Sequence, residues 1–236
     1  MNENELLEFN QRVISEINVA RTFPRIFATK AFNTVCNYKG TLLKIEGNEI
    51  NTKEGVKGLL NAIAFLKTVH PLYSFNQQDE INKAAEEQLN NLQNNKEEDE
   101  LRYRLNTHCY AFGNLIELMS IGDLSPFNIV LNFIIGDGDD TKEARQIIFS
   151  QTYKDIGISS GILPGSKKKC VILNFVQYFF HLNDTIPSNL IYEYEDEIKE
   201  IRLKKEEKMN QKINLPFKEL SKYNQIILVF FHQQEN

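Results

Sequence analysis

The stretch from Gly113 to Ser160 constrains the fold of this chain more than any other part of the sequence. Near its start Glu117 is a lone carboxylate among apolar residues, and Ser125-Pro126 follows a few residues later. A serine at a helix cap accepts from the free amides of the first turn, and proline suits the first helical position. The stretch then runs through an acidic turn at 136–140, a short second helix ending near 149 and a strand start at 155–160. We therefore expect a mixed helix and strand core.

The acidic turn Gly136-Asp137-Gly138-Asp139-Asp140 invites a calcium interpretation. A calcium-binding loop of the helix–loop–helix type needs oxygen ligands at alternate positions and a glutamate at position twelve, and that spacing is absent. We interpret the turn as solvated. Asp137 and Thr141 are both placed to cap the helix that follows.

Apolar residues at spacings of three and four predict further helices. The four predicted helices are Glu3–Thr22, Thr52–Lys67, Ser74–Leu92 and Pro126–Ile135. The third begins with Ser74 because Ser74 and Gln77 have the spacing of a capping box. Residues 157–160 and 170–180 are predicted to be paired antiparallel strands, since the loop between them carries Pro164, Gly165 and three lysines.

The central stretch resembles the CAP superfamily, the family of cysteine-rich secretory and pathogenesis-related proteins, in the branch common in bacteria and protists. The matching letters are Gly113, Glu117, Gly122, Ser125, Pro126, Ile129, Val130, Ile134, Ile135, Asp137, Gly138, Arg145, Ile148, Gly157 and Ile158. The segments INVARTFPRIFA and NTKEGVKGLLNAIAFLKTVHPL are also similar to the family. The resemblance implies an α+β fold: a three-layer α-β-α sandwich with a central antiparallel sheet, formed by a CAP-like domain over residues 1–183.

The chain departs from the family at positions that matter for chemistry. Lys142, Glu143 and Ala144 stand where the family has Arg, Gly and His, and Gln88 stands where relatives place a histidine. An amide is a poor metal ligand beside neutral imidazole. We therefore interpret the family cavity as vestigial, with no catalytic residue, metal or cofactor. Its four positions are Gln88, Glu117, Ala144 and Arg145.

Two of these residues are predicted to be structural. Gln88 lies on the apolar stripe of its helix, and buried polar groups are normally hydrogen-bonded, so we expect it to be a satisfied core residue. A buried lone carboxylate is costly. We expect Glu117 to lie in the core near Arg145 or Gln88 with its charge paired, since arginine can bind a carboxylate through two hydrogen bonds.

Composition limits which classes of partner this protein can bind and which cellular compartment it suits. A formal charge of -5 argues against a nucleic-acid partner, which calls for a basic surface. Three widely spaced cysteines without a CxxC motif make a zinc site improbable and suit a reducing compartment. The first residues lack the apolar core of a secretory signal, and no apolar run is long enough to span a membrane. We expect a cytoplasmic protein, with cytoskeletal and ciliary arrays as candidate hosts.

Residues 184–236 lie beyond the resemblance and are predicted to form a C-terminal helix–strand extension. Its charged helix, 193–212, has acidic residues first and basic residues later, which suits the helix dipole. Its apolar strand, 225–232, needs a covering partner, because uncovered strands recruit other chains. We predict that this extension contacts other proteins. The predicted partner-binding residues are Ile198, Ile201, Lys204, Lys205, Ile227, Val229 and Phe230.

Two classes of function follow. The first is a non-enzymatic CAP-like scaffold or interaction protein, a structural subunit of a larger intracellular assembly whose partners are other proteins. The alternative is a CAP-type ligand-binding or hydrolytic protein that uses a cleft around Glu117. Acid–base work and metal binding both need a second group beside a single carboxylate, which favours the first class.

Overall fold

The computed structural model describes residues 2–96 and 99–213, which fall into two units, one ending at Thr185 and the other beginning at Ile186. The second unit contains α8 (Ser188–Glu193) and α9 (Glu195–Ile213), and α9 corresponds to the predicted charged helix. The predicted strand 225–232, with Ile227, Val229 and Phe230, lies outside the described residues. Among the helices that the structure describes, none has the length and apolar character to cross a membrane.

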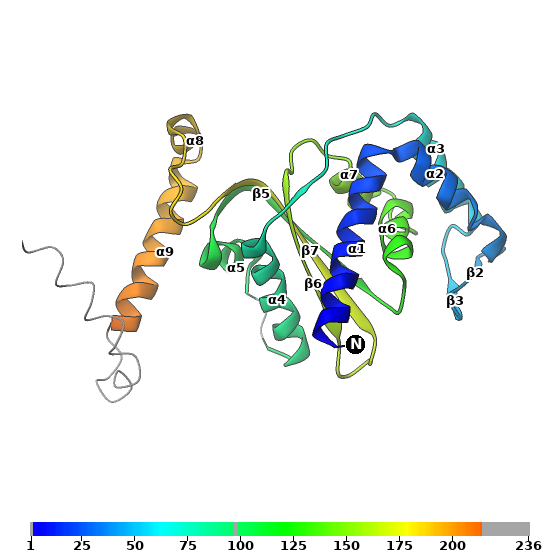
Figure 1. The fold of residues 1–236 in the computed structure, drawn as a ribbon, viewed down its shortest axis with the longest axis horizontal. Helices are drawn as coiled ribbons and strands as arrows, with labels where there is room; N and C mark the ends of the chain where they lie inside the picture. Colours follow the sequence, from blue (N-terminus) through cyan, green and yellow to red (C-terminus); the bar gives the residue numbers. More distant parts are fainter. Residues whose placement is uncertain (1, 97–98, 214–236) are drawn as a thin grey trace, which may run out of the picture. The chain divides into compact units, whose positions relative to one another are not determined.

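The first unit contains seven α-helices among its described residues, a short 3-10 helix at Val35–Asn37 and two sheets (Figure 1). The helices are α1 (Glu3–Thr22), α2 (Pro24–Phe32), α3 (Val56–Thr68), α4 (Asp79–Gln93), α5 (Leu101–His108), α6 (Pro126–Ile135) and α7 (Glu143–Ile148). The larger sheet consists of β4 (Asn76–Gln77), β5 (Tyr110–Ile121), β6 (Asp155–Ile162) and β7 (Lys169–Phe180). The smaller sheet consists of β1 (Tyr38–Lys39), β2 (Leu42–Ile45) and β3 (Asn48–Asn51).

The larger sheet has the order β4-β6-β7-β5. β7 pairs antiparallel with β6 on one side and with β5 on the other, while β4 adds a two-residue parallel pairing to β6. The predicted antiparallel pairing of residues 157–160 with 170–180 is confirmed. The fold is α+β with an antiparallel central sheet, as predicted.

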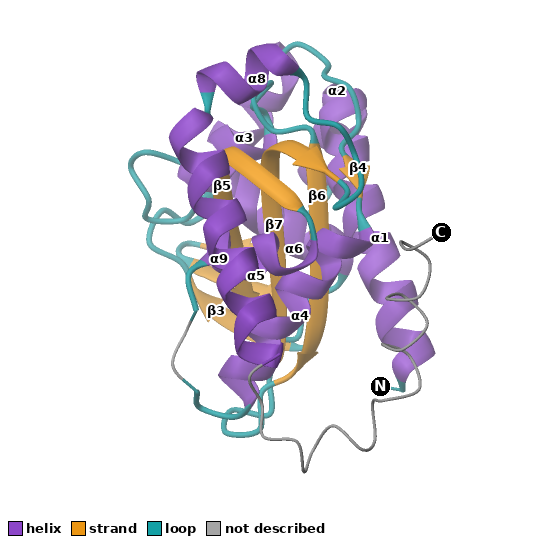
Figure 2. Cartoon of the chain, turned by 90° about the vertical axis from the view of Figure 1, so that its left-hand side faces the viewer, coloured by secondary structure: helices purple, strands orange, loops and turns teal. Residues whose placement is uncertain are grey.

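Helices cover both faces of this sheet, because the side chains of the central strand β7 are apolar on both faces. Successive side chains of a strand point to opposite faces. One face of β7 joins the core formed with α1, α2, α3, α6 and α7, through Val171, Leu173 and Phe175. The other packs against α4 and α5, through Cys170, Ile172 and Val176. Phe175 is completely buried, and burial of one such side chain stabilises a fold by about 1.5–3 kcal/mol. The unit is therefore a three-layer α-β-α sandwich (Figures 1 and 2).

Two helices have the predicted bounds because their ends carry local signals. α1 begins after Asn2, whose side chain accepts from Glu5 N at 2.9 Å while the Glu5 carboxylate accepts from Asn2 N, so both orphan amides are satisfied. α6 begins with Pro126 and ends where Gly136 adopts φ 56°, a left-handed conformation that glycine adopts readily.

Two predicted helix starts are wrong because contacts between distant segments override the local pattern. α3 begins at Val56 rather than Thr52, since the Thr52 amide donates to the Thr41 carbonyl at 2.9 Å and Gly55 has φ 60°. α4 begins at Asp79 rather than Ser74, because Asn76 and Gln77 pair with β6 as β4. The small sheet, α2 and α5 were not predicted.

Candidate functional site

Glu117 lies on β5, and its register determines which layer it faces. Its Cα partner on β7 is Asn174, two positions from Ile172 and Val176 on the face covered by α4 and α5. The side chain of Glu117 is 21% exposed, so it is mostly but not fully withdrawn from water. Glu117 therefore belongs to the α4/α5 layer.

Arg104 of α5 is the charge partner of Glu117. Its side chain is 2% exposed, and its guanidinium Nη2 donates to Glu117 Oε2. The other guanidinium nitrogens donate to the carbonyls of Ala84, at 3.3 Å, and of Asp99. The prediction that Glu117 is paired is confirmed, but the predicted partner was Arg145 or Gln88. Arg104 was missed because α5 follows a polar loop and was not predicted to be a helix.

A second donor reaches the same carboxylate from β7. The Asn174 side chain is fully buried, and in the amide orientation that satisfies both of its ends it donates to Glu117 Oε2 at 2.9 Å. Its oxygen then accepts from Ala85 N of α4 at 3.2 Å. Glu117 Oε2 is thus bound from α5 and from β7, and the pair links one layer of helices to the sheet.

The thiol of Cys170 lies within the electrostatic influence of this carboxylate. Burial, followed by the charge of Glu117, raises the pKa of the Cys170 thiol to about 11. At neutral pH the thiol is therefore protonated, and a protonated thiol is a poor nucleophile. Cys170 is a core residue rather than a reactive group.

Gln88 lies one turn along α4 from Ala84 and Ala85 and is 1% exposed. Its Oε1 has no hydrogen-bond partner among the described residues, so the prediction that Gln88 is fully satisfied is wrong. An unpaired buried acceptor costs about 1–3 kcal/mol. Gln88 shares a helical layer with Glu117, but no described hydrogen bond joins the two.

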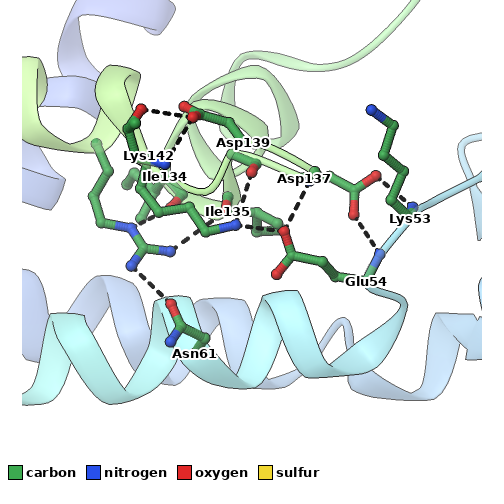
Figure 3. Close-up of polar contacts among 12 residues, drawn as sticks. Lys53, Glu54, Asn61, Ile134, Ile135, Asp137, Asp139 and Lys142 are labelled. Carbon is green, nitrogen blue, oxygen red and sulfur yellow. Dashed lines mark hydrogen bonds and ion pairs between the residues drawn. The ribbon is translucent and has the colours of Figure 1, made fainter.

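Arg145 and Ala144 belong to α7, in the other layer. The Arg145 guanidinium donates to the carbonyls of Ile134, at 2.5 Å, and Ile135, at 3.3 Å, which end α6. It also donates to Asn61 Oδ1 of α3 at 2.8 Å (Figure 3). Burial lowers the pKa of Arg145, and these acceptors hold it in place. The four positions of the predicted vestigial cavity are thus divided: Gln88 and Glu117 lie on one face of the sheet, Ala144 and Arg145 on the other.

The acidic turn after α6 is hydrogen-bonded to the segment before α3. Both carboxylate oxygens of Asp137 accept from backbone amides, those of Lys53 at 2.7 Å and Glu54 at 2.8 Å (Figure 3). The Glu54 carboxylate accepts in return from Gly138 N at 2.8 Å and from Lys142 Nζ. The Lys142 hydrogen bond is the main cause of the lowered pKa of Glu54.

The prediction that Asp137 or Thr141 caps the next helix is wrong, because the N-cap residue of α7 is Lys142 and its side chain makes no capping hydrogen bond. The Asp139 carboxylate accepts from the first amide of the helix, Glu143 N, at 2.8 Å and from Thr141 N at 2.9 Å. The Thr141 hydroxyl donates to the same carboxylate at 2.6 Å, and these bonds lower the pKa of Asp139. Within residues 2–96 and 99–213, no group of three or more His, Cys, Asp or Glu side chains could hold a metal ion.

A cavity of about 400 Å³ lies between the small sheet and α6. Its walls come from β2, β3, α6, the acidic turn and neighbouring segments. The lining residues are Thr34, Tyr38, Leu43, Ile45, Ile50, Thr52, Met119, Leu124, Asn128, Leu131, Asn132, Phe133, Ile135, Gly136, Asp137, Asp139 and Ala144. Ala144 is the one position of the predicted family cavity on this wall, and Glu117 is not part of it.

No family model matches the sequence, and no curated protein matches it. An outer surface protein from Borrelia burgdorferi is similar in structure, with a TM-score of 0.36 and 15% identity over 44% of this chain and 77% of that one. A cysteine-rich secretory protein from Staphylococcus aureus has a TM-score of 0.37 and 13% identity over 56% of this chain and 41% of that one.

Proposed function

We propose that this chain is a non-enzymatic interaction protein, a CAP-like scaffold that serves as a structural subunit of a larger intracellular assembly. The observation that carries this proposal is the state of Glu117. Its Oε2 accepts from both Arg104 and Asn174. The charge of Glu117 is thus already engaged in joining α5 to the sheet, and acid–base or nucleophilic chemistry would need a second group beside it to complete the reaction.

The other residues suggested by the family resemblance also have structural roles. Arg145 satisfies the last carbonyls of α6, which would otherwise lack partners at the helix end. Asp137 and Glu54 join two loops to each other. These polar groups stabilise the fold, which supports a scaffold role over chemistry on a substrate.

The proposed contact with other proteins lies on the second unit. Its described surface carries exposed apolar residues, Tyr192 of α8 at 86% and Leu203 of α9 at 60%. Ile198 and Ile201, predicted as contacts from their spacing, are 1% and 4% exposed, so they are not available on the surface. We therefore place the contact at Leu203 and the adjoining lysines, Lys204 and Lys205.

The charges of α9 suit an interaction surface rather than a core helix. Acidic residues begin the helix, and ion pairs four residues apart follow, Glu195–Lys199 at 2.5 Å and Glu200–Lys204 at 2.6 Å. Such exposed pairs contribute little to stability, because water screens both charges, so they do not explain a helix on their own. A partner surface of mixed charge would be attracted by this pattern, and salt would weaken the attraction.

The test compares two leucine-to-glutamate variants of the full chain. Leu203→Glu places a charge in the proposed contact, and Leu7→Glu does the same on α1, where the leucine is similarly exposed at 56%. Proteins that co-purify with the tagged wild-type chain from its own cells should be depleted with Leu203→Glu and retained with Leu7→Glu, as measured by quantitative mass spectrometry. Circular dichroism checks that both variants are folded.

Three results would count against the proposal. If Leu203→Glu retains every partner, α9 is not the contact surface. If both variants lose the same partners, the effect is not specific to α9. If no protein co-purifies with the wild-type chain above the background of an unrelated tagged protein, the scaffold function itself is rejected.

A further inference from the structure

We propose that residues 225–232 of this chain add as a further strand to the outer edge of β5 and so extend the larger sheet of the first unit. This inference goes beyond the proposed scaffold function and does not depend on it, since that function uses the surface of α9. Residues 225–232, QIILVFFH, lie outside the described residues.

Every second residue of β5 turns its backbone groups away from β7. The Gly122 amide donates to the Lys169 carbonyl at 2.8 Å, in the same register as the pairing of β5 with β7. Hydrogen bonds to one neighbour alternate along an antiparallel strand, so Ser120 bonds to β7, whereas Met119 and Ile121 present their N–H and C=O groups to the outer side. Among the described strands of this sheet β5 is the last, and none pairs with it on that side.

This part of the edge is accessible and apolar. Met119 and Ile121 are 44% and 51% exposed. The segment 115–121 contains no proline or lysine, and its one charged residue is the paired Glu117. Natural proteins commonly use prolines, lysines or bulges to keep an edge strand from pairing further, and the bulge of β5 lies before this segment. An edge without these devices recruits another strand.

The opposite edge of the same sheet, on β6, is closed by described residues. β4 pairs with the first two residues of β6, and Figure 2 shows β4 and β5 at the two sides of the sheet. Further along, Asn82 Oδ1 accepts from Ile158 N at 2.8 Å, and Gln93 Nε2 donates to the Ile162 carbonyl at 3.0 Å. The fold thus satisfies backbone groups along the β6 edge, whereas the outward groups of Met119 have no partner among the described residues.

The sequence of residues 225–232 suits the β5 edge in length and in composition. It has eight residues against the seven of 115–121. Residues 226–231 are all apolar, and all but one are β-branched or aromatic, the types that favour strands. Because successive side chains of a strand point to opposite faces, such a segment is apolar on both faces, as strands between two layers are.

β5 itself lies between two layers. Leu115 packs with α4 and α5, and Ile116 packs with the core on the other face. A strand added beside β5 would extend the sheet between the same layers. Because the segment belongs to the same chain, tethering raises its effective concentration at the edge above that of a separate partner, which favours it over a second copy.

The test is amide hydrogen exchange of the full chain, followed residue by residue by NMR. The outward amides of Met119 and Ile121 should exchange at least about 100-fold more slowly in the full chain than in a chain that ends at Asn224. The amides of Leu118 and Ser120, which bond to β7, are the internal controls and should stay protected in both. The effect should therefore alternate along β5, which a general loss of stability would not produce.

A second variant keeps the full length of the chain. Leu228→Pro/Val229→Pro removes two consecutive N–H groups, one of which faces β5 in any register, and proline is excluded from the centre of a paired strand. This variant should release the outward amides of β5 as the truncation does. Gln233→Pro/Gln234→Pro, beyond the segment, is the matched control and should leave those amides protected. Circular dichroism checks that each variant is folded.

The proposal is overturned if Met119 and Ile121 exchange rapidly in the wild-type chain, since nothing would then pair with the edge. It is equally overturned if both stay protected in the folded truncated chain or in the folded Leu228→Pro/Val229→Pro variant, because something other than residues 225–232 would then cover the edge. Protection that falls on dilution, together with a dimer in sedimentation velocity, would assign the cover to a second copy and would also reject pairing within one chain.

Discussion

The ion pair of Glu117 with Arg104 should be the most sensitive polar contact of the first unit, and Glu117→Ala tests it. The substitution leaves the Arg104 guanidinium, 2% exposed, with only the carbonyls of Ala84 and Asp99 as acceptors. Asn174 loses an acceptor as well. Breaking a buried pair by removing one partner costs about 3–5 kcal/mol.

The expected cost lies at the lower end of that range. Because the Glu117 side chain is 21% exposed, water already solvates part of its charge, and water can reach the space it leaves. We expect Glu117→Ala to lower the free energy of unfolding by about 3 kcal/mol. Glu117→Gln should cost roughly half as much, since its amide oxygen can still accept from Arg104.

The assay is urea unfolding followed by circular dichroism at 222 nm, with tyrosine fluorescence as a second probe. With a slope of about 2 kcal/mol per molar urea, a loss of 3 kcal/mol moves the midpoint down by about 1.5 M. The matched control is Glu49→Ala, which breaks a pair with Lys44 in which both side chains are 59% exposed. Exposed pairs contribute about 0–1 kcal/mol.

A midpoint shift for Glu117→Ala no larger than that of Glu49→Ala would refute the structural role of the pair. The double variant Glu117→Ala/Arg104→Met gives a further check. The double variant should lose less unfolding free energy than the two single variants summed. Each single variant leaves one buried charge without its partner, whereas the double variant leaves none. Strict additivity would mean that the two side chains do not interact.

Two further perturbations test the packing and the electrostatics of the sheet. A Cβ added at Gly157 of β6 would lie 2.3 Å from backbone of α4, so Gly157→Ala should force the helix from the sheet and cost about 1–3 kcal/mol or more. Gly165→Ala, where an added Cβ meets nothing within 4 Å, is its control, and equal melting temperatures for the two variants would contradict the close approach. Burial raises the pKa of Asp155 above its ordinary value of 3.8, so the folded state holds that proton more tightly than the unfolded state. The stability from this group is therefore present at low pH and lost as the pH rises through the folded pKa. Asp155→Asn keeps an acceptor for Gln78, 2.7 Å away. Relative to the wild type, the melting temperature of this variant should rise as the pH increases through the folded pKa of Asp155. A difference independent of pH would show that Asp155 is not desolvated.

The elements that could be predicted from the sequence are those whose limits are set by neighbouring residues. α1 and α6 have the predicted bounds because a capping box, a proline and a left-handed glycine act within one helical turn. The start of α4 could not be predicted in this way. Residues 76–77 resemble a helix entry locally, yet they pair with β6, nearly eighty residues further along the chain.

The partner of Glu117 was missed for a related reason. The resemblance placed Glu117 and Arg145 in one motif, and a shared motif suggests a shared site. In the structure the sheet separates them, and Arg104 reaches Glu117 from a helix whose preceding loop is polar and acidic. Nothing in the periodicity of residues 101–108 marked a helix against β5, because most of that helix is polar.

The cross-strand partner of Glu117 depends on a single extra residue in β5. The register slips between Phe112 and Leu115, so that β5 has one residue more than β7 across this interval. Gly113 has φ 75° there, and Asn114 donates its backbone and side-chain N–H groups to Gln177 Oε1 at 3.0 and 2.7 Å.

Without that bulge the pairing downstream would shift by one, and Glu117 would lie opposite Leu173 instead of Asn174. The bulge sets the partner of Glu117 and not its face, since Ala111 and Leu115, on either side of the bulge, both pack in the layer of α4 and α5. The residues that match the family pattern before and after the bulge are the same whether or not the bulge is present. The pairing of Glu117 with Asn174, which supplies its second donor, is therefore a consequence of backbone register, and a match of residue types does not contain that register.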